Sequence, residues 1–112
     1  MGNDDRFEVL RRALAPDRYS DATIRVLADN ACELEYPTGA TLVVDGAATT
    51  ESWLVLSGRI EICWRSGLRS VAEAGELIDP SHGNEATRSV ITAEVLDSAA
   101  VLAIPRTQPH GP

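Results

Sequence analysis

Short apolar runs separated by turn-forming residues fill most of this chain, and they constrain its fold more than any other feature. These runs cover residues 32–36, 41–44, 53–56, 60–64, 69–72, 76–78, 89–96 and 100–104. The breaks between them are rich in Gly, Pro, Asp and Ser, which favour turns because of their backbone preferences or local hydrogen bonds. Many brief strands at nearly regular spacing are typical of a β-sandwich or a β-barrel.

The stretch from Trp53 to Arg65 holds two β-rich runs, which Ser57 and Gly58 divide. In the second run, alternate residues fall on opposite faces of a strand, so we expect one buried and one exposed side. The apolar face carries Ile60, Ile62 and Trp64, and the polar face carries Arg59, Glu61 and Arg65. A tryptophan ring can stack on a base, but in a strand it is more often part of the core. We therefore predict core positions for Trp53 and Trp64.

Before residue 32 the apolar spacing changes to that of helices. Two short helices are predicted between about residues 5 and 31, with apolar faces formed by Phe7, Leu10 and Leu14, and by Ile24, Leu27, Ala28 and Ala31. Asp4 or Asp5 is expected to cap the first helix, and Pro16 to end it. Ser20 supplies an N-cap hydroxyl for the second helix, and Asp21 an acidic first turn.

Length and charge restrict the organisation and the partners of the chain. A chain of 112 residues is long enough for one domain, which we place at 1–105, with the roll at 32–105 and a frayed tail at 106–112. The net charge is −7, and all ten basic residues are arginines without a local basic patch, so neither nucleic acid nor a membrane surface is an expected partner. No signal peptide or membrane-spanning stretch is recognisable, so a cytosolic location with reduced thiols is predicted.

The sequence offers few residues that could bind a metal ion or carry redox chemistry. Cys32 and Cys63 lie far apart, and only His82 and His110 are available to join them around a metal. We therefore predict no metal site and no cofactor, and we expect both cysteines to be small buried apolar side chains. His82 has no nucleophile at a recognised motif spacing and is interpreted as a loop histidine.

Three glycine-containing segments carry a resemblance to a known family. They are Tyr36-Pro-Thr-Gly-Ala-Thr-Leu-Val-Val-Asp-Gly46, Trp53-Leu-Val-Leu-Ser-Gly-Arg-Ile-Glu-Ile62 and Ala74-Gly-Glu-Leu-Ile78. In this order and spacing, the chain from about residue 5 to residue 105 resembles the cyclic-nucleotide-binding domain family. The resemblance implies a mainly β fold, a jelly-roll-like β-roll (double-stranded β-helix) of about eight strands, with two short N-terminal helices packed on it.

The same resemblance implies a ligand cassette, in which a Gly-Glu-Leu segment holds the ribose and an Arg holds the cyclic phosphate. A delocalised phosphate is matched by backbone N–H groups and one guanidinium, and a ribose hydroxyl by a carboxylate. The candidate ligand-binding residues are Gly75, Glu76, Leu77, Thr87, Arg88 and Ser89. Catalytic and metal-binding candidates are absent from this set.

Two alignments to the family remain open. In the first, Glu76 is the ribose-binding acid, and the stretch to Arg88 must bulge. In the second, Gly75-Glu76 is the glycine-acid pair that precedes the cassette, so the family's Gly-Glu falls on Asp79-Pro80 and its Arg on Thr87. Arg88 would then face the wrong way, because a one-residue shift in a strand turns a side chain to the opposite face. The second alignment is favoured, and it predicts weakened or lost binding of cyclic nucleotides.

Three functions follow as alternatives. The favoured one is a non-catalytic regulatory or sensory module that takes a small anionic or cyclic-nucleotide ligand weakly and acts on a protein partner or a fused effector. The second is a protein-interaction or assembly module on the same scaffold. The third is a small cupin-like enzyme, which would need more metal ligands than two histidines supply. Arg88 also has a simpler interpretation, as a surface ion pair with Glu85.

Overall fold

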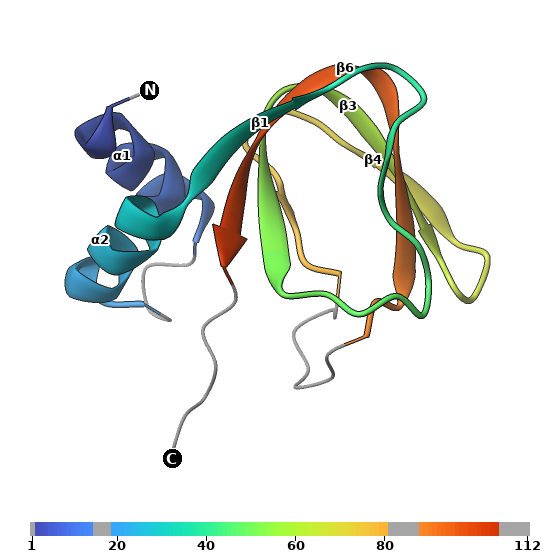
Figure 1. Cartoon of the computed structure of the whole chain (residues 1–112), viewed down its shortest axis with the longest axis horizontal. Helices are drawn as coiled ribbons and strands as arrows, with labels where there is room; N and C mark the ends of the chain where they lie inside the picture. The colour runs from blue at the N-terminus through green and yellow to red at the C-terminus, as the bar shows by residue number, and fades with distance from the viewer. Residues whose placement is uncertain (1, 15–18, 81–87, 106–112) are drawn as a thin grey trace.

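The computed structural model describes residues 2–14, 19–80 and 88–105, and it contains two helices followed by strands (Figure 1). The elements in chain order are α1 (Asn3–Ala13), α2 (Asp21–Asn30), β1 (Cys32–Tyr36), β2 (Thr41–Val43), β3 (Glu51–Trp64), β4 (Arg69–Ala72), β5 (Leu77–Ile78) and β6 (Ile91–Pro105). The predicted fold class is confirmed, because the strands form one antiparallel rolled sheet that follows two N-terminal helices in the chain. Neither described helix is long and apolar enough to cross a membrane.

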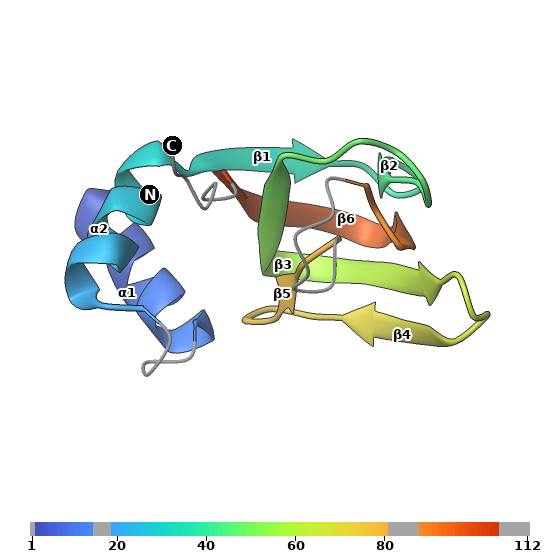
Figure 2. The ribbon, with the colours of Figure 1, turned by 90° about the horizontal axis from the view of Figure 1, so that it is seen from below.

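The long strands β3 and β6 pair with each other over nearly their whole length and form the centre of the roll. One half of this pair has β1 and β5 on its outer edges, and the other half has β2 and β4. Because β3 and β6 each serve both halves, the described strands correspond to the eight strand segments expected of the roll. Figure 2 shows that β3 runs in one direction beside β5 and in another beside β4.

The corner between the halves lies at Gly58, where a break between two strands was predicted. That prediction was wrong in one respect: β3 continues through Ser57 and Gly58, and the pairing register with β6 shifts between Val55 and Ile60. Gly58 has φ of +85°, which glycine adopts without a steric penalty. The expected break between 96 and 100 is likewise absent, since β6 is continuous. An irregular register allows the paired strands to bend without ending.

The core has two parts, because alternate residues of β3 and β6 face opposite sides. Trp53, Val55 and Val101 belong to the cluster inside the roll, whereas Leu54 and Leu102 pack with the helices. The predicted apolar helix faces are confirmed. Their buried members are Leu10, Leu14, Ile24, Leu27, Ala28 and Ala31. Figures 1 and 2 both place the helices at one end of the roll.

Helix capping is confirmed for α2 and wrong for α1. The Ser20 hydroxyl accepts a hydrogen bond from the Thr23 N–H at 3.2 Å, and Asp21 lies in the first turn of α2. Helix α1 begins earlier than expected, with Gly2 as the N-cap and no side-chain cap, so Asp4 and Asp5 lie within its first turn. There they still interact favourably with the positive end of the helix dipole. Pro16 and the tail 106–112 lie outside the described residues.

Three further predictions about burial need correction. Cys32 is exposed and Cys63 half-buried, and both are free thiols. Cys32 begins β1, which is an edge strand of the sheet, so only one side of it has a neighbouring strand. Of the two tryptophans, Trp53 is the core residue with 5% exposure, whereas Trp64 is half-buried at the end of β3.

Candidate functional site

The two chain segments that flank the predicted cassette meet inside the fold. The Val90 N–H donates a hydrogen bond to the Pro80 carbonyl at 2.9 Å, and Pro80 is fully buried. Ile78, two residues earlier, is also buried in the roll cluster. Thr87, His82 and Glu85 lie outside the described residues, so the expectations for Thr87, for the His82 loop and for an ion pair of Glu85 with Arg88 are left as predictions.

Gly75 and Glu76 form a tight turn before β5. Gly75 has φ of +91°, and its N–H donates to the Val55 carbonyl, while the Val55 N–H donates to the Glu76 carbonyl. The Glu76 carboxylate accepts a hydrogen bond from the Glu73 N–H at 2.8 Å. The Glu76 carboxylate therefore closes the turn in which Glu76 itself lies. Both Glu76 and the following Leu77 are exposed.

Arg88 and Ser89 differ in burial in the segment that leads into β6. Burial alternates along this segment: Ser89, Ile91 and Ala93 are buried, and the residues between them are not. Ser89 is fully buried, whereas Arg88 is exposed. The Ser89 hydroxyl donates to the Ile91 carbonyl at 2.7 Å and accepts from the Ile91 N–H, so its hydrogen bonds stay local.

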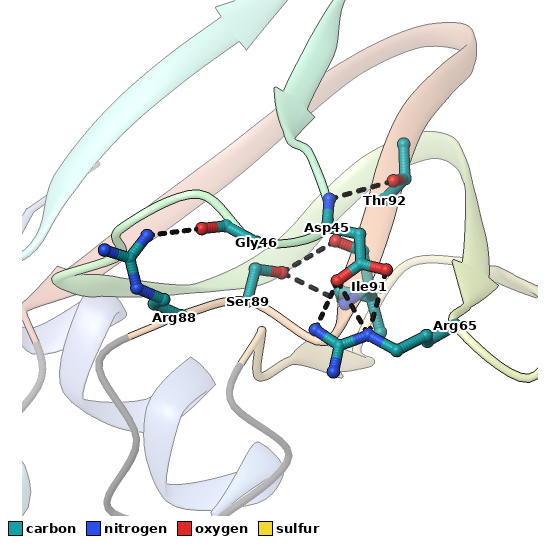
Figure 3. Close-up of polar contacts among 7 residues, drawn as sticks. All are labelled: Asp45, Gly46, Arg65, Arg88, Ser89, Ile91 and Thr92. Carbon is teal, nitrogen blue, oxygen red and sulfur yellow. Dashed lines mark hydrogen bonds and ion pairs between the residues drawn. The ribbon is translucent and has the colours of Figure 1, made fainter.

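The guanidinium of Arg88 is held by the loop after β2. Its Nη1 donates to the Gly46 carbonyl at 2.9 Å, as Figure 3 shows. Backbone hydrogen bonds join the same segments, from the Gly46 N–H to the Ser89 carbonyl and from the Ser89 N–H to the Ala47 carbonyl, each at 2.8 Å. Arg88 and Glu76 therefore have separate partners in separate loops.

A salt bridge fixes the loop that receives Arg88. The Arg65 guanidinium donates to both oxygens of the Asp45 carboxylate, with a shortest distance of 2.6 Å from Nη2 to Oδ1 (Figure 3). The Asp45 N–H donates to the Thr92 hydroxyl at 3.0 Å. The hydrogen bonds from Arg65 lower the pKa of Asp45 and raise the pKa of Arg65. A break after residue 44 was predicted from the sequence, but this pairing was not, because Arg65 lies in the turn after β3, 20 residues away in sequence.

A cleft of about 330 Å³ lies elsewhere, at the corner of the roll. It is lined by Glu35, Tyr36, Pro37, Ser57, Ser98, Ala99 and Ala100. None of the predicted site residues is among them. Across residues 2–14, 19–80 and 88–105, no three His, Cys, Asp or Glu side chains gather in a way that could hold a metal ion.

Comparisons with known proteins identify the fold. No protein-family model matches the sequence, and no curated protein matches it. Solved structures do match. A candidate cyclic-nucleotide-binding protein from Ruegeria pomeroyi DSS-3 has a TM-score of 0.76 at 20% identity, over 94% of this chain and 49% of that one.

Two protein kinase A regulatory proteins are also similar. The regulatory domain from Toxoplasma gondii, solved with cAMP, has a TM-score of 0.77 at 12% identity, over 92% of this chain and 42% of that one. The regulatory subunit of a cAMP-independent protein kinase A from Trypanosoma cruzi, bound to guanosine, has a TM-score of 0.76 at 14% identity, over 95% of this chain and 40% of that one. The present chain spans half or less of each of these three proteins. Its fold is the β-roll of cyclic-nucleotide-binding domains.

Proposed function

We propose that this chain is a non-catalytic regulatory or sensory module of the cyclic-nucleotide-binding type in which binding of cyclic nucleotides is weakened or lost. The fold supports a regulatory or sensory role, since two of the similar structures are regulatory parts of kinases. One of those holds cAMP, and the other, which is cAMP-independent, holds guanosine. A roll of this kind can therefore serve regulation with more than one nucleotide-like ligand.

The observation that carries the weakened or lost binding of cyclic nucleotides is the arrangement of Arg88 and Ser89. The buried Ser89 hydroxyl bonds the backbone of Ile91, while the exposed guanidinium one residue earlier donates to the Gly46 carbonyl. A cyclic phosphate inside the roll would lack this guanidinium. Since a hydrogen bond to a charged group contributes about 1.5–3 kcal/mol, its absence would weaken binding by roughly 10- to 150-fold.

The roles of Glu76 and Pro80 support the favoured alignment. Glu76 is exposed and closes its own turn, which suits the glycine-acid pair before a cassette better than a ribose-binding acid. Pro80 then occupies the family's acidic position, where it offers neither a carboxylate nor a backbone N–H. The ribose would then have no carboxylate acceptor and the phosphate no guanidinium donor, so we expect affinity to fall by about a thousandfold or more.

Calorimetric titration with cAMP, cGMP and cyclic di-GMP tests the proposal. We expect heats that fit only a Kd of about a millimolar or weaker for each nucleotide, a thousandfold above a micromolar site. Matched titrations of Arg88→Gln should look the same as those of the wild type, since the exposed Arg88 guanidinium is held by the Gly46 carbonyl. A micromolar or tighter Kd that Arg88→Gln abolishes would show that the guanidinium reaches the phosphate, and the proposal would be wrong.

A further inference from the structure

The path of four strands through the sheet ends at β1 and at β4, and each of these strands pairs on one side only. β1 pairs with β6, and β4 pairs with β3 (Figure 2). Within residues 2–14, 19–80 and 88–105, no strand pairs with the other side of either. An open strand edge offers backbone N–H and carbonyl groups to another chain, and proteins usually protect it, often with charged side chains.

The backbone of Val71, near the middle of β4, points away from β3. In the turn between the two strands, the Trp64 N–H donates to the Leu68 carbonyl at 2.8 Å. Backbone groups of successive residues point alternately to the two sides of an antiparallel strand, so those of Arg69 and Val71 face the open edge. Val71 is 41% exposed, and Ser70 is also exposed. The edge of β4 therefore combines outward backbone groups with an exposed apolar side chain.

Two exposed residues of opposite charge flank Val71. Arg69 lies two residues before it and Glu73 two residues after it. Alternate residues of a strand share one face, and Glu73 directly follows the last residue of β4. The Arg69 side chain is 68% exposed and has only a loose contact within the chain, 4.0 Å from its Nη1 to Glu61 Oε2. Both flanking charges can therefore reach a neighbouring strand.

The sequence of β4 is complementary to itself, whereas that of β1 is not. In a symmetric antiparallel pair of β4 strands centred on Val71, Arg69 of each copy lies opposite Glu73 of the other. Opposite charges at directly opposed positions stabilise a sheet, and like charges destabilise it. A symmetric pair of β1 strands, centred on their middle residue, would instead place Glu33 opposite Glu35. The edge at β1 is thus protected against a second copy, and the edge at β4 is not.

We propose that the open edge of β4 binds a second copy of this chain, in a two-fold symmetric antiparallel pair centred on Val71. The two Val71 residues exchange backbone hydrogen bonds, and an Arg69–Glu73 ion pair closes each end of the contact. The Glu73 N–H keeps its bond to the Glu76 carboxylate, which confines the ladder to the middle of β4. Because so short a contact buries little surface, the dimer is weak, with a Kd of about 10 µM to 1 mM.

Sedimentation equilibrium of the whole chain tests for this dimer. The mean mass should rise from that of the monomer toward that of the dimer between about 10 µM and a few millimolar protein. A salt concentration of about 0.15 M screens the net charge of −7 that each copy carries. A wild-type protein that remains monomeric over this whole range would show that the inference is wrong.

Charge reversal tests the register of the pair. Arg69→Glu and Glu73→Arg each turn both ion pairs into like-charge contacts, so each should raise the Kd at least about tenfold. The double variant restores opposite charges and should dimerise like the wild type. Glu8→Arg, at an exposed position of α1, changes the net charge as much as Glu73→Arg does and should leave the Kd unchanged.

A mixture of the two single variants makes the test independent of small effects on folding. In a mixed dimer of Arg69→Glu with Glu73→Arg, every facing pair is again of opposite charge, so the equimolar mixture should associate where neither variant does alone. A dimer that persists in both single variants, or that neither the mixture nor the double variant restores, would show that the copies meet elsewhere. The proposed weakening of nucleotide binding does not depend on this contact and is tested separately by titration.

Discussion

Gly58 on β3 lies so close to Ser98 on β6 that a Cβ atom at position 58 would overlap the Ser98 carbonyl oxygen and lie 2.7 Å from the Ala99 Cα. This close approach is at the corner where the two halves of the roll meet. The backbone of Gly58 also has a positive φ, so two independent constraints select glycine there.

Gly58→Ala is therefore expected to be among the most destabilising small substitutions in the chain. The positive φ alone costs an alanine about 1–2 kcal/mol, and the overlap with backbone atoms adds to it because neither strand can move alone. Urea denaturation should show a loss above about 2 kcal/mol. Gly39→Ala is the matched control, since Gly39 has φ of +90° but no atom near its missing Cβ, and it should lose only the conformational part. Equal losses for the two variants would argue against a close-packed corner.

The salt bridge between Asp45 and Arg65 should make stability depend on acid pH. Its hydrogen bonds lower the pKa of Asp45 in the folded state below the ordinary value of 3.8. The stabilisation is therefore complete above pH 3.8 and is lost as the pH falls through the lower folded-state pKa. Asp45→Asn should have a lower Tm than the wild type at pH 6, and the difference should shrink toward pH 2.5.

Arg65→Gln provides the control for this pH effect. The double variant with Asp45→Asn should lose no more stability at pH 6 than either single variant loses, since each change already breaks the pair. High salt should reduce the loss of stability that each single variant causes, because both side chains are solvent-accessible. Additive losses would mean that the two residues stabilise the loop separately.

Local sequence patterns predicted the helices and strands of this fold, but they did not predict the contacts between segments that are distant in sequence. The helical spacing of Leu10 and Leu14, and the N-cap at Ser20, depend on neighbours within one turn, and both were confirmed. The corner at Gly58 could be identified only as an interruption. Whether a Ser-Gly pair ends a strand or bends it depends on the strand beside it, where Ala100 pairs with Ser57 and Asp97 with Arg59.

The candidate site shows the same limit at finer scale. The favoured alignment predicted that Arg88 faces away from the ligand, but the partner of Arg88, the Gly46 carbonyl, is a backbone group that no residue pattern reveals. The exposure of Cys32 follows from its place on an edge strand, which the order of the strands along the chain does not give.

The N-cap of α2 offers a test of how the helices support the roll. Ser20→Ala removes the acceptor for the Thr23 N–H and should cost about 1 kcal/mol. Ser20→Asp keeps an acceptor at the same place and should retain the stability of the wild type. Since α2 packs through Ile24 and Leu27 against the sheet, both variants should be compared by the cooperative unfolding of the whole domain. An unchanged Tm for Ser20→Ala would indicate that the first turn of α2 is held by its packing alone.

Glu76 separates the two alignments of the cassette most directly. If its carboxylate only closes the turn at Glu73, Glu76→Ala should lower stability by about 0.5–1.5 kcal/mol and leave the affinity for adenosine and cAMP unchanged. Glu76→Gln keeps Oε1 as an acceptor for the Glu73 N–H and should recover most of that stability. If instead Glu76 accepts a hydrogen bond from the ribose, both variants should weaken binding of adenosine and cAMP by about tenfold or more, since each removes the charged acceptor. Titrations of the three proteins under one set of conditions distinguish a turn residue from a ligand-binding one, because stability and affinity then change in different variants.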